Sequence, residues 1–351
     1  MKIDQLDKNL IPASIPSDVE LEFYNVLSSP FKIYGIFREG DHFARVPSEV
    51  SDKIGSVGVS FMRKQTTGGR VSFRTNSKYI VVRVALDELY EKSDSTSFAS
   101  AGFDIYEENV FRGILYAPYN YPDKYATAKI FPDQKERKLI INLPLFSPIS
   151  EMEIGLEKGA DLEAYEPYDD TLPVVYYGSS ITHGAIASRP GNAYPAKIAR
   201  EIGVDFINLG FGGNAKGEVA MAEYIASLPM SAFVMDYDYN APSFDYLSST
   251  HEAFYRIIRN KNPNLPIILV SSPDVWFHGT RKMMRTVVMN TYARAMASGD
   301  KNIYFVDGAT LYQGTDPDFC TVDGIHPNDH GFYQMAMGIL PFVKQAIGRK
   351  A

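Results

Sequence analysis

Cysteine and tryptophan are nearly absent from this chain of 351 residues, which has one of each, Cys320 and Trp276. A single cysteine excludes an internal disulfide and a metal cluster held by cysteines, so nothing in the sequence requires an oxidising compartment. No motif surrounds Cys320. We therefore expect it to be a small buried apolar residue rather than a nucleophile or a redox group.

Long apolar runs and an excess of positive charge are also missing. The N-terminus lacks the uninterrupted apolar region of a signal peptide, and no stretch is long enough to span a bilayer. We expect a cytoplasmic protein, or a periplasmic or secreted one if a signal peptide has been removed. Lys and Arg number 35 against 42 Asp and Glu, which gives a net charge of −7. That balance gives no electrostatic reason to expect a nucleic acid or a membrane as partner, and a neutral substrate fits it better.

The composition is that of a folded protein, with 45% hydrophobic and 22% charged residues. Between Phe31 and Leu156 there are short segments rich in β-branched and aromatic residues, bounded by Gly, Pro, Asn and Ser. They cover residues 31–37, 70–74, 79–84, 138–143 and 152–156. Strands at this spacing without helices between them indicate an antiparallel β-sandwich or jelly roll. We assign them to an N-terminal domain, residues 1–165.

A polar segment, residues 157–170, reads as a linker, and the pattern changes after it. Strand-like runs at 173–177, 204–209, 231–236, 266–270 and 302–306 alternate with helical patterns near 192–202, 215–227, 246–260, 281–298 and 329–346. Five such alternations indicate a parallel sheet that is covered by helices on both faces. We therefore predict a three-layer, doubly wound α/β domain over residues 172–351.

The first strand of this second domain leads into a tight turn with two serines. Val174–Tyr177 is followed by Gly178-Ser179-Ser180, and a helical pattern begins shortly afterwards. Such a turn places a side chain and several N–H groups at the carboxyl edge of a parallel sheet, where open α/β folds place their chemistry. Ser180 is our candidate for the reactive side chain. Ser179 is the rival within the turn and could instead cap the helix.

Three more loops of this domain carry unusual residues: the glycine-rich Asn208–Asn214, the segment Asp236–Asn240, and Asp323-Gly324-Ile325-His326-Pro327. Together with the serine turn, these loops resemble the sequence blocks of the SGNH (GDSL-type) hydrolase superfamily, in the same order. That family has its nucleophile in G-x-S-x-[ST], which Gly178–Thr182 matches with Ser180, and a D-x-x-H-P motif, which Asp323–Pro327 matches. The resemblance covers about residues 172–346 and implies a flavodoxin-like sheet, esterase activity and no cofactor.

The same resemblance assigns the oxyanion hole to the N–H groups of Ser180 and Gly213 and to the side-chain amide of Asn240. Two blocks depart from the family pattern: Ser179 stands where aspartate is usual, and Asp238-Tyr239-Asn240-Ala241 stands where G-x-N-D is usual. Upstream, Ala101–Tyr106 and Thr67–Arg70 resemble a subgroup in which a β-sandwich with a G-x-D-L-Y signature precedes the hydrolase domain.

The residue types also support ester hydrolysis by their own chemistry. A serine hydroxyl is a poor nucleophile until a base takes its proton, and histidine is the usual base near neutral pH. A carboxylate such as Asp323 can hold the imidazole of His326 in the required tautomer and stabilise its cation. Two or three fixed donors, such as those of Ser180, Gly213 and Asn240, would then stabilise a tetrahedral oxyanion.

We therefore expect a serine esterase that hydrolyses short acyl esters of small molecules or oligosaccharides. O-acetyl groups on carbohydrate are favoured because loops of the sandwich can reach over the cleft and bind the unreacting part of the substrate. A short-chain lipid or small-ester acylhydrolase, and a carbohydrate-binding protein with an inactive hydrolase domain, are the alternatives. The sequence does not indicate the oligomeric state.

Metal and nucleotide sites are the competing interpretations of these loops. Asp323, His326, Asp329 and His330 include metal-ligand types, but Pro327 prevents a helix from continuing back through His326, and no third ligand cluster appears. We therefore expect no metal. The segment 210–216 lacks the G-K-[ST] ending of a phosphate loop, so we do not expect a nucleotide site there. His183 and Trp276 are our candidates for substrate contacts in the cleft wall.

Overall fold

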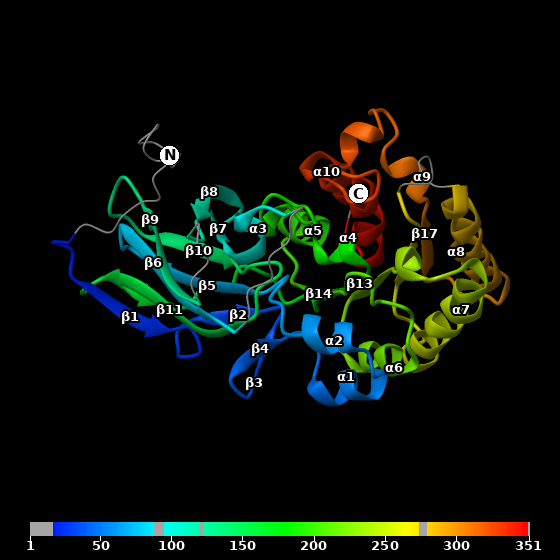
Figure 1. Ribbon diagram of the computed structural model, residues 1–351, viewed down its shortest axis with the longest axis horizontal. Helices are drawn as coiled ribbons and strands as arrows, with labels where there is room; N and C mark the ends of the chain where they lie inside the picture. Colours follow the sequence, from blue (N-terminus) through cyan, green and yellow to red (C-terminus); the bar gives the residue numbers. More distant parts are fainter. Residues whose placement is uncertain (1–16, 88–94, 119–122, 274–278, 350–351) are drawn as a thin grey trace.

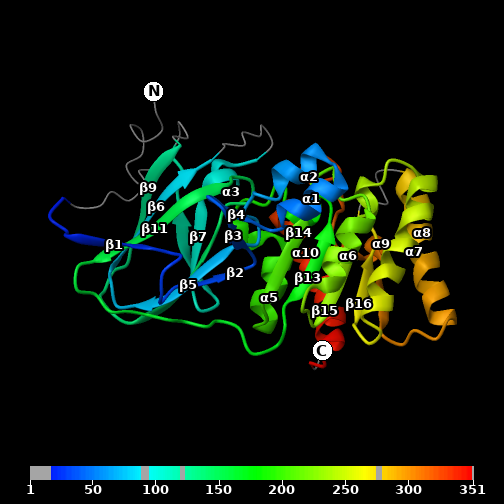
Figure 2. The ribbon, with the colours of Figure 1, turned by 90° about the horizontal axis from the view of Figure 1, so that it is seen from below.

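The computed structural model describes residues 17–87, 95–118, 123–273 and 279–349, which form a β-rich region and an α/β region (Figure 1). The two regions lie side by side along the long axis of the molecule, as the perpendicular view also shows (Figure 2). We call them the sandwich region, residues 17–163, and the α/β region, residues 172–349. The division into domains 1–165 and 172–351 stays a prediction.

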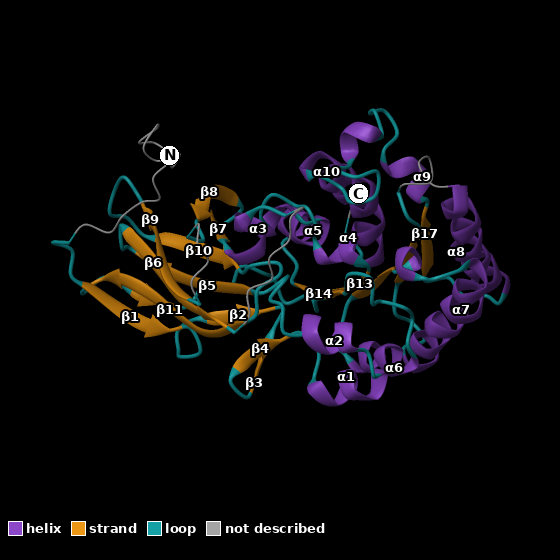
Figure 3. Cartoon of the chain, in the orientation of Figure 1, coloured by secondary structure: helices purple, strands orange, loops and turns teal. Residues whose placement is uncertain are grey.

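In the described residues, the sandwich region has two main antiparallel sheets (Figure 3). One has the strand order β1-β11-β6-β9, and the other has the order β12-β5-β10-β7-β8, with β2 also paired to β5. Side chains of both sheets meet in one core, for example Val82 and Ile154 of the first with Phe73 and Ile141 of the second. The predicted sandwich is confirmed. Its strands are β1 (Leu21–Asn25), β2 (Lys32–Tyr34), β3 (Phe37–Glu39), β4 (His42–Ala44), β5 (Arg70–Thr75), β6 (Tyr79–Leu86), β7 (Phe103–Glu107), β8 (Val110–Leu115), β9 (Lys124–Ile130), β10 (Arg137–Asn142), β11 (Ile149–Glu157) and β12 (Leu162–Glu163).

Short helices interrupt these strands: α1 (Ser48–Ile54), α2 (Val57–Met62) and α3 (Ser97–Ala101). The expectation of strands without helices between them was therefore wrong. Helices of five to seven residues are too short to leave a clear 3.6-residue periodicity in the sequence. The buried side chains of α1 and α2, Val50 and Val59, pack into a core of the α/β region and not into the sandwich core.

The α/β region is built on a five-stranded parallel sheet with the order β14-β13-β15-β16-β17. This is the predicted doubly wound arrangement, with the flavodoxin-like strand order. Its strands are β13 (Val174–Gly178), β14 (Phe206–Gly210), β15 (Ala232–Asp236), β16 (Ile267–Val270) and β17 (Ile303–Val306). Its helices are α4 (Ser180–His183), α5 (Tyr194–Ile202), α6 (Val219–Ser227), α7 (Phe244–Lys261), α8 (Gly279–Ala297), α9 (Gly308–Leu311) and α10 (Asp329–Ala346), with 3-10 turns η3 (Pro190–Asn192), η4 (Asp238–Asn240) and η5 (Asp318–Cys320).

Helices cover both faces of this sheet. Since successive side chains of a strand point to opposite faces, each strand contributes to two cores. Val174 and Tyr176 of β13 lie in the core that includes α5 and α10. Val175 and Tyr177 lie in the core that includes α6, α7 and α8. Because both faces of β13 are buried, the strand is apolar along its whole length.

The register of the parallel strands aligns the ends of three of them. Gly178 at the end of β13 pairs with Gly210 of β14 on one side and with Asp236 of β15 on the other. The loops after these strands therefore leave the same edge of the sheet at the same level. That edge carries the residues with predicted roles in catalysis.

The two regions share a buried interface whose centre is Arg45, which is 1% exposed. Its guanidinium donates four hydrogen bonds, all to main-chain oxygens, and its plane lies over the ring of Phe211. Two of the acceptors, Met62 and Gln65, belong to the sandwich region, and two, Asn208 and Gly210, belong to β14. Arg45 therefore fixes the end of β14 relative to the segment that follows α2.

The two sandwich signatures found in the sequence also lie at this interface. Thr67 Oγ1 donates to the main-chain oxygen of His183 at 2.7 Å, and Arg70 pairs with Asp205. Asp104, in the position of the signature aspartate, is fully buried and accepts from Gly191 N at 2.8 Å and from Arg189 at 3.0 Å. Thr67 and Asp104 thus join the sandwich to α4 and the segment after it, and Arg70 joins it to the start of β14.

Candidate active site

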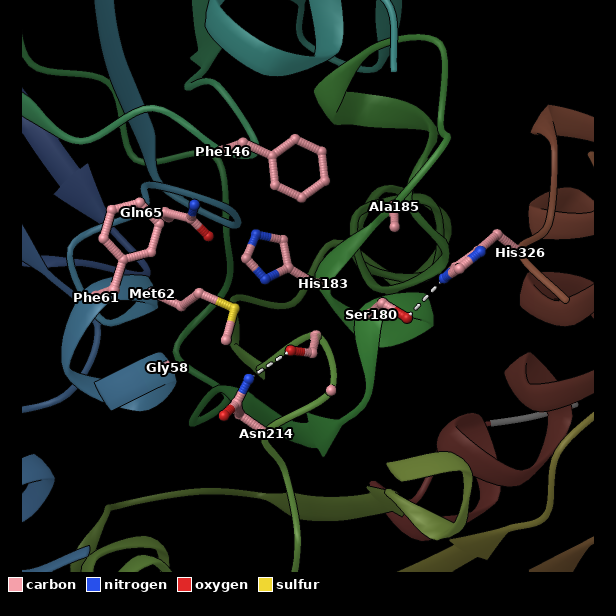
Figure 4. A pocket seen from close by; sticks show the side chains of 12 residues that line it. Gly58, Phe61, Met62, Gln65, Phe146, Ser180, His183, Ala185, Asn214 and His326 are labelled. Atoms are coloured by element: carbon pink, nitrogen blue, oxygen red, sulfur yellow. Dashed lines mark hydrogen bonds between the residues drawn. The ribbon is translucent and has the colours of Figure 1, made fainter. Parts of the chain in front are cut away.

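The serine turn is shaped by a glycine and a serine cap. A Cβ atom at Gly178 would overlap Thr182 Oγ1 and the main-chain oxygen of Asp236, so only glycine fits there. Ser179 is the N-cap of α4, and its hydroxyl accepts the Ile181 N–H at 3.1 Å. Its side chain is thereby engaged in the turn, whereas Ser180, the first residue of α4, faces the cavity (Figure 4). This arrangement favours Ser180 over Ser179 as the nucleophile.

Ser180, His326 and Asp323 form a continuous row of hydrogen bonds. Ser180 Oγ lies 2.9 Å from His326 Nε2, drawn as a dashed line in Figure 4, and His326 Nδ1 lies 2.7 Å from Asp323 Oδ2. With Nδ1 donating to the carboxylate, Nε2 is the free acceptor for the serine hydroxyl. The structure therefore brings these three predicted residues together across 146 positions of sequence.

The loop between η5 and α10 holds the Asp323 carboxylate in place. Its Oδ1 atom accepts the N–H groups of Ile325 at 3.0 Å and His326 at 2.7 Å. Burial tends to raise the pKa of Asp323, but the hydrogen bonds from His326 and Ile325 and the charge interaction with His326 outweigh it, so that the pKa is lowered. Asp323 is therefore a carboxylate at neutral pH. The main-chain N–H of Val322 donates to the His326 oxygen at 3.0 Å and closes the loop.

The glycine-rich loop after β14 passes close to Ser180. A Cβ atom at Gly212 would lie 3.3 Å from Ser180 Cβ, and Gly213 adopts a φ of 69°, in the left-handed region that favours glycine. Asn214 secures the loop by donating from Nδ2 to the Gly212 oxygen at 2.8 Å. These contacts place the main chain of Gly212 and Gly213 beside the nucleophile turn, where the sequence predicts an oxyanion donor.

Asn240 stands in η4, the turn after β15, and its Nδ2 donates to the Phe211 oxygen at 2.9 Å. This bond ties the third loop to the glycine-rich loop. A primary amide nitrogen carries two hydrogens, so the same group has a second donor. Asp238 anchors η4 by accepting the N–H and the hydroxyl of Ser272 at 3.0 and 2.7 Å. The role of Asn240 in an oxyanion hole stays a prediction.

Beneath the serine turn lies a buried carboxyl group, Asp236. Thr182 Oγ1 and the Tyr194 hydroxyl donate to its Oδ2 atom at 2.9 and 3.0 Å. Burial, with a contribution from the charge of Asp238, raises the pKa of Asp236 to about 8. The group is thus mostly protonated at neutral pH and supports α4 through Thr182.

A cavity of about 370 Å³ opens at Ser180 (Figure 4). Gly212, Gly213 and Asn214 line it on the α/β side together with Ser180 and His326. The opposite wall comes from the sandwich region, where α2 and the residues after it supply Phe61, Met62 and Gln65, and the β10–β11 loop supplies Phe146.

The sequence interpretation expected loops of the sandwich over the cleft but did not identify the residues of this second wall. No motif marks Phe61, Met62, Gln65 or Phe146, because their position at the cavity depends on how the two regions pack. The packing is close: a Cβ atom at Gly58 would overlap the side chain of Asn214, and Ser56 Oγ donates to Asn214 Oδ1 at 3.1 Å.

His183 lines the cavity but is 1% exposed. Its Nδ1 lies 3.0 Å from the Gly210 oxygen and its Nε2 lies 2.7 Å from the Leu145 oxygen, while its ring stacks on Phe146. Both nitrogens therefore face main-chain oxygens, and a contact with substrate would have to involve the ring. The other predicted contact residue, Trp276, lies outside the described residues.

The remaining candidates take part in other contacts. Asp329 accepts from Ser188 N at 2.9 Å and from Asn192 Nδ2 at 2.7 Å, and His330 Nε2 lies 3.1 Å from Thr315 Oγ1. Cys320 is fully buried, as expected. Within the described ranges, no group of three or more His, Cys, Asp or Glu side chains has a metal-binding arrangement.

Family comparisons match both regions of the chain. The model of the GDSL-like lipase/acylhydrolase family matches residues 171–344, and the GxDLY model, the N-terminus of Esterase_SGNH_hydro-type proteins, matches residues 21–162. The chain belongs to the SGNH (GDSL-type) hydrolases, in the subgroup with an N-terminal GxDLY region. The predicted family is confirmed, and the match to a lipase/acylhydrolase model supports an esterase.

Solved structures share the whole architecture. A protein of Bacteroides ovatus ATCC 8483, classed as a GDSL-like lipase, is 27% identical with a TM-score of 0.85, and the match covers 95% of this chain and 100% of that one. The salicylyl-acyltransferase SsfX3 of a tetracycline biosynthetic pathway is 21% identical (TM-score 0.78, coverage 93% and 98%). A family two carbohydrate esterase from Clostridium thermocellum, in complex with cellohexaose, is 13% identical (TM-score 0.62, coverage 81% and 94%). The last two similarities show a common fold. The comparison with curated proteins gave no match.

Among the described helices, none is long and apolar enough to cross a membrane.

Proposed function

We propose that this protein is a serine esterase that hydrolyses short acyl esters with Ser180 as nucleophile, His326 as base and Asp323 as its orienting carboxylate. The observation that carries the proposal is the row of hydrogen bonds from Ser180 Oγ to His326 Nε2 at 2.9 Å and from His326 Nδ1 to Asp323 Oδ2 at 2.7 Å. Nucleophile and base are within the distance that proton transfer requires, and the base is oriented by a third group.

In this proposal, His326 Nε2 takes the hydroxyl proton while Ser180 Oγ attacks the ester carbonyl carbon. The tetrahedral oxyanion is bound by the N–H groups of Ser180 and Gly213 and by the second N–H of the Asn240 amide. His326 then gives its proton to the leaving alcohol, and an acyl-enzyme forms on Ser180. A water molecule repeats the sequence, so that the acid is released and Ser180 regains its proton.

Two classes of substrate have support. Carbohydrate esterases of family two share the fold, and one similar structure is an acetyl xylan esterase from Butyrivibrio proteoclasticus, at 13% identity and a TM-score of 0.60. These similarities favour O-acetyl groups on carbohydrate, with the substrate a small-molecule or oligosaccharide ester. The apolar wall of the cavity, formed by Phe61, Met62 and Phe146, favours the second candidate, a small-ester acylhydrolase that accepts larger acyl groups.

The test of the proposal is the hydrolysis of p-nitrophenyl acetate by the wild-type protein and by Ser180→Ala. We expect Ser180→Ala to lose nearly all activity, because the residual rate of a triad enzyme without its nucleophile is about 10⁶-fold lower in kcat. Ser179→Ala is the matched control and should retain much of the activity. Full activity in Ser180→Ala would refute the nucleophile, and no activity in the wild type would favour a carbohydrate-binding protein. A panel of acetylated oligosaccharides, followed by acetate release, would then distinguish the substrate classes.

A further inference from the structure

Gln65 is the feature of the cavity that the proposed mechanism does not use. It is 1% exposed, its side chain lines the cavity, and its Oε1 atom has no hydrogen-bond partner among the described residues. A buried polar group without a partner typically costs about 1–3 kcal/mol, so such groups are usually retained where a ligand or water completes them.

The main chain of Gln65 is held by hydrogen bonds, and its side chain is packed inside the protein, since the residue is 1% exposed. Its N–H donates to the Met62 oxygen at 3.1 Å, and its carbonyl accepts from Arg45 Nε at 2.8 Å. It also forms an isolated β-bridge with Pro148. A group fixed in this way loses little conformational entropy when it binds a ligand.

The cavity extends from Ser180 and His326, which both line it, to the wall formed by the sandwich region. In Figure 4, Ser180 stands between His326 on one side and Phe61, Met62 and Gln65 on the other. His326 must deliver its proton to the leaving alcohol, so the alcohol occupies the His326 side of the tetrahedral carbon. The acyl group then lies on the other side of that carbon, toward Phe61, Met62 and Gln65 (Figure 4).

The cavity is larger than an acetyl group requires. Its volume is about 370 Å³, whereas a cavity of about 150 Å³ is enough to bind benzene. Aromatic and thioether side chains, Phe61, Phe146 and Met62, form the apolar wall, and the Gln65 carboxamide is the polar group set into it. An apolar pocket with one fixed polar group selects ligands that have an apolar body and a polar group placed to form a hydrogen bond with it.

We infer that Gln65 is a specificity-determining residue that binds a hydroxyl group on a ring-sized acyl group, of the hydroxybenzoyl type, held in this cavity. The inference rests on the proposed function, because it requires an acyl group on Ser180. A hydroxyl can accept from the amide nitrogen or donate to the amide oxygen, so either end of the Gln65 carboxamide can bind it. The sandwich region thereby selects the acyl group that the α/β region transfers.

The experiment compares p-nitrophenyl esters of acetate, benzoate, 3-hydroxybenzoate and 4-hydroxybenzoate on the wild type and on Gln65→Met, which keeps the length of the side chain and removes its hydrogen bonds. We expect the wild type to prefer one hydroxybenzoate over benzoate by about 10-fold in kcat/KM, the value of one hydrogen bond of about 1.4 kcal/mol. Gln65→Met should abolish this preference, because it removes the hydrogen bond to the hydroxyl group and keeps the apolar wall. Gln345→Met, the same change at an exposed position of α10, is the control and should keep the preference.

Three results would overturn the inference while leaving the esterase proposal intact. The wild type could hydrolyse the acetate ester but not the aromatic esters, or the wild type and Gln65→Met could show the same preference for hydroxybenzoate over benzoate. In the third result, Gln65→Met would change kcat/KM only among acetate esters of different alcohols. The last result would place the alcohol in the cavity. Ser180-independent turnover of all esters would instead refute the proposed function. A cooperative thermal melt close to that of the wild type establishes that Gln65→Met is folded.

Discussion

Replacing Asp323 by asparagine tests how the hydrogen-bonded row works. In the native loop, Oδ1 of Asp323 accepts two main-chain N–H groups, from Ile325 and His326, and Oδ2 faces His326 Nδ1. An asparagine must keep its single oxygen on the two N–H groups, so its NH₂ group turns toward Nδ1. Two donors cannot face each other, and the imidazole proton moves to Nε2. His326 then cannot accept the proton of Ser180.

The size of the effect follows from the exposure of the carboxylate. In a buried triad the same exchange lowers kcat by about 10⁴-fold. The side chain of Asp323 is 42% exposed, so water can compensate part of the loss. We expect Asp323→Asn to lower kcat by about 10³-fold, or ~4 kcal/mol in activation free energy, with little change in KM.

The assay is steady-state hydrolysis of p-nitrophenyl acetate, with a thermal melt to establish that the variant folds. Asp318→Asn is the matched control, since Asp318 is an exposed aspartate just upstream, next to the same loop, and should retain full activity. A loss of less than 10-fold in Asp323→Asn would contradict the tautomer argument. It would mean that His326 keeps its Nδ1 proton without the carboxylate.

Three further perturbations test the support of the site. Arg45→Met removes four hydrogen bonds to main-chain oxygens, three of them buried and one part-buried. Denaturant titration should find a loss of about 3–5 kcal/mol in unfolding free energy, and an unchanged value would refute the central role of Arg45. Asp236 has a pKa of about 8 in the folded protein, against 3.8 for the free group. Its contribution to the unfolding free energy is therefore complete at low pH and is lost as the pH rises from about 4 through 8. The unfolding free energy should fall over that window in the wild type and fall less in Asp236→Asn, and parallel curves would contradict this. Gly178→Ala places a methyl group against Thr182 and Asp236 and should lower the melting temperature and the activity, whereas Gly279→Ala, where a Cβ meets nothing, should do neither.

The strands and helices of the α/β region could be predicted almost completely, because the sequence pattern of each element lies within the element itself. Predicted strands such as 231–236 and helices such as 329–346 lie within a few residues of the observed β15 and α10. Each element is long enough to show its own periodicity, and strands buried on both faces are apolar throughout. The roles of Ser180, Asp323 and His326 could likewise be proposed from sequence, because each lies in a short motif at the end of a predicted element.

The sandwich region was predicted less well. Helices α1 and α2 are too short to leave a periodic signal, and strands such as β3 and β4, of three residues each, are not distinguishable from turns in sequence. The positions of α1 and α2 depend on contacts with the other region, for example Val59 in a core of the α/β region. Local propensity cannot record a contact between segments more than one hundred residues apart.

The fold class, the serine turn and the residues along one sheet edge can be derived from local sequence patterns, because neighbouring residues carry the signals of strands, turns and helices. What faces Ser180 across the cavity depends on how the two regions pack. Gln65 and Phe61 reach that place because Arg45 fixes the chain after α2 against the end of β14. This placement depends on a buried guanidinium that binds four distant main-chain oxygens. Every residue type has a main-chain oxygen, so the sequence does not indicate which residues accept these hydrogen bonds.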